Sequence, residues 1–386
     1  MNINNKQKHA HYPVLDALRG CAAIFVAQRH MAGDFWAGHG FYRTYLAVDL
    51  FFLLSGFVIA AAYSNRLESG QLTPNRFMLI RWIRLYPMYF LATTLAILAV
   101  IPSIGAAVSK GGHVWAALGL TSIATFMFLP SHWLGGIFLF SLNFSFWSLF
   151  YELIINAGYA CVAKLLNNFR LAIIILGALI LVITLALKMD TDINDGWGWG
   201  WGWAWVHVFM GVARSMFGIG AGILLYRMRH RLAQALRVEA GGHAMLGIGI
   251  PLLAMLLMAT PSIGVFDVPF DIFVCAVLFP LAVFLATFVN WTNGWFLLIC
   301  SALGSISYPI YVLHIPISQL IKTFTPTLGE TYPVTSGLAV LVFLMALSYV
   351  AEKVYEIPVR RWLNQRLLGP SRVMAEQPNN EIVVVK

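Results

Sequence analysis

Apolar stretches about 20 residues long recur along this chain from residue 15 to residue 355. A helix of about that length crosses the hydrocarbon core of a bilayer. Of the 386 residues, 60% are hydrophobic and only 11% are charged, whereas soluble domains carry about 25% charged residues. The pattern therefore predicts an all-α, polytopic transmembrane bundle. It excludes a soluble domain, a disordered chain and a secreted disulfide scaffold.

Hydropathy predicts about ten membrane-spanning helices. They cover residues 15–35, 45–63, 84–101, 145–166, 171–188, 205–226, 243–260, 271–290, 295–320 and 335–355. A further apolar segment, 114–140, is interrupted by Pro130, His132 and adjacent glycines. We expect this segment to be re-entrant, although crossing the membrane twice would give the same topology.

The positions of Lys and Arg predict the orientation, because positively charged loops stay in the cytoplasm. Basic clusters lie near residues 66–84, 164–170, 227–237 and 353–366. With ten crossings, both termini are cytoplasmic. The expected parts are a cytoplasmic segment 1–14, a membrane domain 15–358 and a cytoplasmic tail 359–386. The net charge of +9 then reflects this topology, and we expect no nucleic-acid partner.

Ionisable residues inside a span are costly and therefore mark candidate functional sites. Arg19 and His30 lie in the first span, eleven residues apart. Eleven residues return to nearly the same helix face, with a rise of about 16 Å. One face thus presents a cation near the cytoplasm and an imidazole near mid-membrane. The alternative is an interfacial ion pair between Asp16 and Arg19 together with a hydrogen-bonded core histidine.

Two later segments combine charge with apolar sequence. Asp49 begins the run DLFFLLSGF, in which Ser55-Gly56 is typical of close helix packing. The segment RWIRLYP places Arg81 and Arg84 three residues apart at the expected cytoplasmic end of a span. Such a pair either anchors lipid headgroups or clamps phosphates with forked donors.

Five segments in order resemble the signatures of the acyltransferase-3 family of integral membrane acyltransferases. They are LDALRG with His30, DLFFLLSGF, RWIRLYP, FWSLFYE (Phe146 to Glu152) and SYPIYVLH (Ser307 to His314). The resemblance covers the chain from Leu15 to about Pro358. We expect the standalone form of the family, without an appended SGNH-type esterase domain.

The resemblance implies transfer of an acyl group, commonly acetyl, from cytosolic acyl-CoA to a hydroxyl of an extracytoplasmic glycan such as O-antigen or exopolysaccharide. It also implies a multi-pass protein of the bacterial inner membrane, in contact with membrane lipids. A lipid-linked sugar or a small molecule is an alternative acceptor. Ten spans with intramembrane charges are also typical of a transporter or flippase, which is the competing non-enzymatic hypothesis.

By the same resemblance, Arg19, Arg81 and Arg84 hold the phosphates of acyl-CoA. His30 acts as a general base or a transient acyl carrier, because histidine is the side chain that titrates near neutral pH. Asp49 either orients His30 or pairs with an arginine. Glu152, expected near the outer end of its span, binds acceptor hydroxyls or takes part in catalysis.

Three further residues are candidates for substrate binding: Tyr308, His314 and Trp201. For His314, a structural contact between helices is an equal alternative. Trp201 belongs to the run GWGWGWGWAW, which is either an interfacial aromatic belt or a platform on which sugars stack. No histidines have the HxxxH spacing of a zinc site, so we expect no metal.

Overall fold

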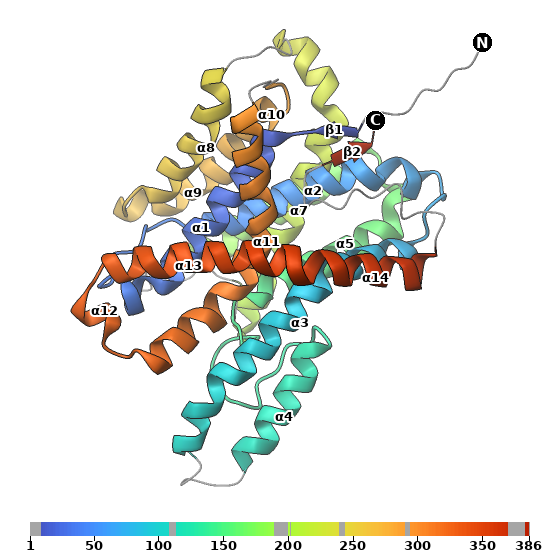
Figure 1. Ribbon diagram of the computed structural model, residues 1–386. Helices are drawn as coiled ribbons and strands as arrows, with labels where there is room; N and C mark the ends of the chain where they lie inside the picture. Colours follow the sequence, from blue (N-terminus) through green and yellow to red (C-terminus); the bar gives the residue numbers. More distant parts are fainter. Residues whose placement is uncertain are drawn as a thin grey trace.

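The protein is an almost entirely helical bundle (Figure 1). The computed structural model describes residues 9–107, 113–188, 200, 202–238, 244–289, 294–369 and 383–385. The longer helices are α1 (Pro13–Phe35), α2 (Leu46–Glu68), α3 (Pro74–Ala107), α4 (His113–Phe126), α5 (Phe146–Val162), α6 (Asn168–Lys188), α7 (Trp205–Leu236), α8 (Ala244–Ala259), α11 (Gly294–Phe324) and α13 (Thr335–Ala351). The predicted all-α class is confirmed.

Shorter elements complete the bundle. They are η2 (Ala163–Leu165), η4 (Gly264–Phe266), α9 (Asp267–Phe273), the π-helix η5 (Val274–Leu278), α10 (Phe279–Ala286), α12 (Leu328–Thr331), the π-helix η6 (Glu352–Glu356) and α14 (Ile357–Leu368). Strands β1 (His9–His11) and β2 (Val383–Val385) form a short antiparallel pair that joins the two ends of the described chain (Figure 1).

Within the described residues, eight helical segments are long and apolar enough to cross a membrane. They are Leu46–Glu68, Pro74–Pro102, Phe146–Leu165, Asn168–Lys188, Trp205–Leu236, Gly264–Ala286, Gly294–Phe324 and Thr335–Leu368. The other two expected spans correspond to α1, which is long but carries several charges, and to α8, which has only 16 residues. Ten crossings therefore stay a prediction, whereas the polytopic character is confirmed.

Two helices extend well beyond the predicted spans. The span expected at 84–101 belongs to α3, which begins at Pro74. The residues before position 84 include arginines, which lower the hydropathy of this segment, but these residues are helical as well. The helix that begins at Thr335 continues through η6 and α14 to Leu368, past the expected domain boundary at residue 358. Pro358 does not end it, and this proline is the second residue of α14, which directly follows the π-helical turn η6.

Close helix packing in the core depends on glycines. α2 packs along α7, where an added Cβ on Gly56 would overlap the carbonyl oxygen of Ile219 and one on Gly222 would overlap that of Leu53. The predicted packing role of Gly56 is thereby confirmed. α1 packs along α11 in the same way, with Gly20 against Leu303. These two helix pairs bring the charged residues of α1 and α2 into the interior.

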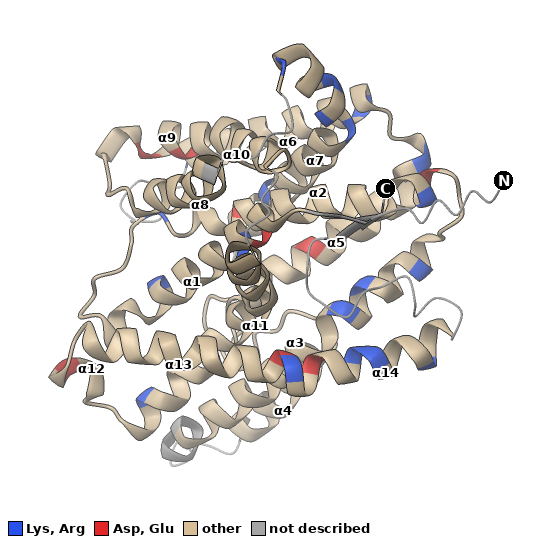
Figure 2. Ribbon diagram, turned by 45° about the horizontal axis from the view of Figure 1, so that its top comes forward, with Lys and Arg blue, Asp and Glu red and all other residues tan. Residues whose placement is uncertain are grey.

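Most of the Lys and Arg residues gather at the end of the bundle where the termini lie (Figure 2). The segment expected to be re-entrant consists of α4, which packs beside α3 (Figure 1), followed by an irregular loop up to residue 145. This loop returns to the bundle next to α11.

Candidate functional site

A pocket lies among α1, α2, α3, α5, α11 and η6. The polar side chains that line it are Arg19, Ser55, Arg81, Arg84, Ser148, Glu152, Ser307, Tyr308, Tyr311 and Glu356. Three guanidinium groups therefore face two carboxylates. The structure brings together the three arginines that were predicted to bind phosphates.

Arg19 is held in place from α11. Its Nε donates to Ser307 Oγ at 2.8 Å, and its terminal nitrogen donates to the carbonyl oxygen of Gly304 at 2.6 Å. The carboxylate of Asp16 lies 3.4 Å away. The ion pair between Asp16 and Arg19 considered from the sequence is present, and it coexists with a position at the cavity wall. Arg19 is therefore preorganised toward the cavity.

Glu152 also lines this cavity. Its carboxylate forms an ion pair with Arg81 and accepts a hydrogen bond from Ser55 Oγ at 2.6 Å. The residue is six positions into α5, about 9 Å along the helix, where it meets α2 and α3. Glu152 is thus the counterion of Arg81, and its role in acceptor binding or catalysis stays a prediction.

Arg84 differs from its neighbour Arg81. The side chain is half-buried and lines the cavity. Within the described part of the chain, it forms no hydrogen bond or ion pair. The charge of Arg81 is matched by Glu152, whereas that of Arg84 is available to a ligand.

His30 and His314 form a direct pair between α1 and α11. His30 Nδ1 lies 2.8 Å from His314 Nε2, and the rings are nearly parallel, with centroids 5.0 Å apart. His314 is completely buried, whereas His30 is exposed. The edge of His30 packs against Phe144, with ring centroids 4.8 Å apart. The sequence offers a structural contact between helices as the alternative role of His314. In the structure this contact is made to His30, the candidate catalytic residue.

Tyr311 links the cavity to the histidine pair. It lines the cavity, and its ring centroid lies 6.0 Å from that of His314. Its hydroxyl is 2.6 Å from Ser148 Oγ and donates to the carbonyl oxygen of Ser145 at 3.0 Å. One turn earlier in α11, Tyr308 also lines the cavity and donates to the carbonyl oxygen of Leu85 at 2.6 Å.

Comparison with known proteins agrees with this arrangement. The profile of the acyltransferase-3 family, described as an acyltransferase domain, matches residues 12–353 of the 386. The chain belongs to the acyltransferase-3 family. "Protein 2 in picA locus" of Rhizobium radiobacter is 38% identical to it over 164 residues, which cover 38% of this chain and 80% of that protein. No solved structure matches the chain. The predicted family is confirmed, and the protein is a multi-pass membrane acyltransferase.

In this acyltransferase, Asp49 pairs with an arginine. Two nitrogens of Arg214, in α7, donate hydrogen bonds to the carboxylate of Asp49 at 3.0 and 2.6 Å, and both side chains are buried. Of the two roles predicted for Asp49, pairing with an arginine is the one present. The paired carboxylate joins α2 to α7 rather than His30 to the cavity.

The remaining predicted residue, Trp201, lies outside the described residues. Its neighbours Gly202 and Trp203 contact the irregular loop, where the amide of Trp203 donates to the carbonyl oxygen of Ile137 at 3.1 Å. Phe138 of this loop stacks on Phe144, with ring centroids 5.1 Å apart. The loop thus connects part of the Trp-rich segment to the ring that packs on His30.

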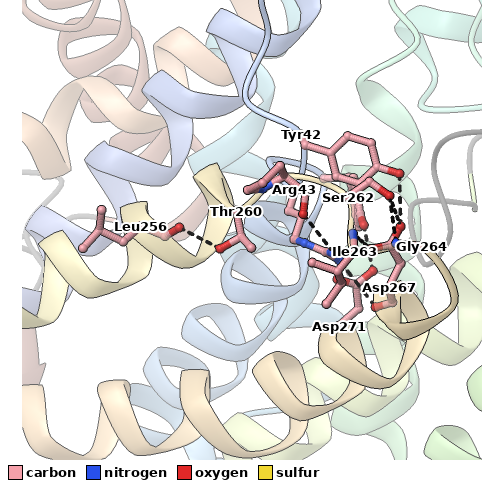
Figure 3. A network of polar contacts seen from close by, with 11 residues as sticks. Tyr42, Arg43, Leu256, Thr260, Ser262, Ile263, Gly264, Asp267 and Asp271 are labelled. Atoms are coloured by element: carbon pink, nitrogen blue, oxygen red, sulfur yellow. Dashed lines mark hydrogen bonds and ion pairs between the residues drawn. The ribbon is translucent and has the colours of Figure 1, made fainter.

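A second buried charge cluster joins the loop before α2 to α9 (Figure 3). Arg43, fully buried, forms ion pairs with both Asp267 and Asp271. Tyr45 donates to Asp271 at 2.7 Å, and the guanidinium lies 4.6 Å from the ring centroid of Phe270. One guanidinium thus neutralises two carboxylates, and we assign the cluster a structural role.

The sequence does not identify several of the cavity residues as site residues. It predicts only a packing role for Ser55, and it does not point to Ser148, Tyr311 or Glu356. Ser148 and Tyr311 lie inside segments that resemble family signatures, which is a signal for them. Glu356 follows a run with no such signal, and it lines the cavity as the last residue of the π-helix η6.

Proposed function

We propose that this acyltransferase moves an acyl group, acetyl in the first instance, from cytosolic acyl-CoA to a hydroxyl of an extracytoplasmic glycan. The single observation that carries the proposal is the cavity with three arginines, one of which, Arg84, has no counterion among the described residues. Acyl-CoA carries several phosphates, and guanidinium groups bind phosphate with forked hydrogen bonds. The clustering of Lys and Arg at the end where the termini lie (Figure 2) supports a cytoplasmic opening and an inner-membrane location.

In this proposal, His30 carries out the proton transfer. Arg19 and Arg84 hold the phosphates, so that the thioester reaches past Tyr311 toward the histidine pair. In direct transfer, His30 takes the proton of the acceptor hydroxyl while that oxygen attacks the thioester carbon. The carbon–sulfur bond breaks, and the proton passes to the thiolate of CoA. Alternatively, His30 attacks the thioester carbon first, the carbon–sulfur bond breaks, and CoA leaves as the thiolate. The acceptor hydroxyl then attacks the acyl-histidine, the carbon–nitrogen bond breaks, and the hydroxyl proton passes by way of the imidazole to the thiolate.

The test uses inside-out membrane vesicles from cells that make the surface glycan. Acetyl-CoA labelled in the acetyl group is added outside, and alkali-labile label in the glycan is measured. We expect label with the wild type and none with His30→Ala at matched expression. Right-side-out vesicles are the control and should remain unlabelled, because acetyl-CoA does not cross the membrane. Equal label with His30→Ala would remove His30 from the chemistry.

The competing functions give different results in the same vesicles. A transporter or flippase moves its substrate without forming an ester, so no alkali-labile label appears even when substrate crosses. A lipid-linked or small-molecule acceptor gives labelled ester in the solvent-extractable fraction instead of the glycan. The glycan proposal is the one that requires label in the polymer itself.

A further inference from the structure

The hydrogen bond between His30 and His314 has a direction that the surroundings determine. Nδ1 of His314 lies 3.2 Å from the carbonyl oxygen of Ile310. A carbonyl oxygen only accepts, so Nδ1 of His314 carries the hydrogen. A neutral imidazole has one N–H group, and Nε2 of His314 is consequently an acceptor.

The tautomer of His30 follows from this acceptor. The 2.8 Å contact joins Nε2 of His314 to Nδ1 of His30, so the shared hydrogen belongs to His30 Nδ1. Nε2 of His30 is then left with a free lone pair. The opposite direction would require a doubly protonated His314, which places a cation on a completely buried side chain at a high desolvation cost.

The surrounding structure keeps His314 in this orientation. Pro316 has no amide hydrogen, which deprives the carbonyl of Val312 of its helical donor. Asn143 takes that place, and its Nδ2 donates to the oxygen of Val312 at 2.9 Å. The next residue, Phe144, packs on the edge of His30. The two adjacent residues Asn143 and Phe144 thus contact α11 and the ring of His30, respectively.

We propose that His314 is a positioning residue that holds His30 in the Nδ1–H tautomer and so makes Nε2 the atom that accepts the proton or the acyl group. The consequence for catalysis rests on the proposed function, because both the general-base route and the acyl-histidine route need a free lone pair on His30. The tautomer of His30 does not depend on the proposed function. His314 thereby has a role distinct from substrate binding.

Solid-state NMR tests the tautomer without any activity. The purified full-length protein is labelled with ¹⁵N-histidine and reconstituted in liposomes, and His30→Gln and His314→Gln variants assign the two signals. We expect a protonated Nδ1 and an unprotonated Nε2 on both rings of the wild type. A protonated Nε2 on His30, or a doubly protonated His314, would overturn the proposal.

Substitution of His314 supplies the functional test. In His314→Gln, the side-chain oxygen replaces Nε2 as acceptor, whereas His314→Leu fills the space without an acceptor. We expect kcat to fall roughly 100-fold or more in His314→Leu, the size of a lost acid–base contribution, with an unchanged KM for acyl-CoA. His314→Gln should retain most of kcat. Equal losses in both variants would indicate a merely structural contact and overturn the proposal.

Two controls separate this proposal from the proposed function. Ser318→Ala changes another buried residue of α11 and should leave both kcat and the His30 signals unchanged. If the wild type transfers no acyl group, the proposed function fails while the NMR spectrum still decides the tautomer. If the wild type is active and His314→Leu is equally active, the positioning role alone fails.

Discussion

At the scale of single residues, two arginines three positions apart on α3 have different partners. Arg81 is buried and neutralised by Glu152, whereas Arg84 faces the cavity with no ion pair among the described residues. The charge of a salt-bridged guanidinium is already neutralised by its carboxylate partner. We therefore expect phosphate recognition to depend more on Arg84, and the stability of the cavity wall more on Arg81.

Arg84→Gln is expected to raise the KM for acyl-CoA roughly 10- to 100-fold, because a hydrogen bond to a charged group contributes about 1.5–3 kcal/mol. The thermal unfolding midpoint should not change. Initial rates at varied acyl-CoA in vesicles measure the first effect. Arg76→Gln, two turns earlier in α3 and outside the cavity lining, is the matched control. A KM equal to that of wild type would remove Arg84 from donor binding.

Arg81→Gln should instead destabilise the protein. It leaves the carboxylate of Glu152 without its counterion, and breaking a buried ion pair costs about 3–5 kcal/mol. Glu152 is 15% exposed, so we expect the lower part of this range. Thermal unfolding in detergent measures the loss, and Arg81→Gln combined with Glu152→Gln should recover part of it. No recovery in the double variant would argue against the pair.

The sequence identifies these polar residues as candidate site residues, but it does not identify the residues that they contact. The spacing of Arg19 and His30 on one helix follows from helix geometry alone. The contact of His30 with His314 joins residues 284 positions apart, and that of Asp49 with Arg214 spans 165 positions. Nothing local in a single sequence encodes such pairs, since they arise only when α1 packs on α11 and α2 on α7. For the same reason, the ion pair of Glu152 with Arg81, 71 positions away, is not predictable from the sequence.

At the scale of elements, the existence of the helices was predictable and their ends were not. Long apolar runs predict helices directly. α3 begins ten residues before its predicted span because hydropathy marks where a helix is apolar, not where it is helical. The π-helix η6, whose last residue Glu356 lines the cavity, gives no periodic signal, since it is a local irregularity.

The close contact of α2 with α7 makes Gly222 sensitive to a single methyl group. In Gly222→Ala, the new Cβ would overlap the carbonyl oxygen of Leu53, so the helices must separate. Overpacking of this kind costs about 1–3 kcal/mol. Thermal unfolding should show a lower midpoint for Gly222→Ala, whereas Gly158→Ala, whose added Cβ meets nothing within 4 Å, should match the wild type or exceed it. Equal midpoints would mean that the two helices are not packed this closely.

At the scale of the whole molecule, the Arg43 cluster joins the N-terminal helices to α9 (Figure 3). Arg43→Met would leave Asp267 and the buried Asp271 without their cation, at a cost of about 3–5 kcal/mol. Arg43→Lys should recover little, because an ammonium cannot bridge two carboxylates with a planar fork. Lys322→Met, which breaks an exposed pair with Asp34, is the control and should cost less than about 1 kcal/mol. Similar unfolding midpoints for the two Met variants would contradict the structural role of the cluster.

The sidedness of the bundle decides which substrate can reach the arginines. Ser69 is exposed in the connection between α2 and α3, a few residues before the helix that carries Arg81 and Arg84, and His39 is exposed in the loop after α1. We expect a membrane-impermeant maleimide to label Ser69→Cys only in inside-out vesicles and His39→Cys only in right-side-out vesicles. The background carries alanine in place of the four native cysteines, Cys21, Cys161, Cys275 and Cys300. Reversed labelling would open the arginine cavity to the outside, where acyl-CoA is absent, and the arginines would then have to bind an extracytoplasmic anion instead.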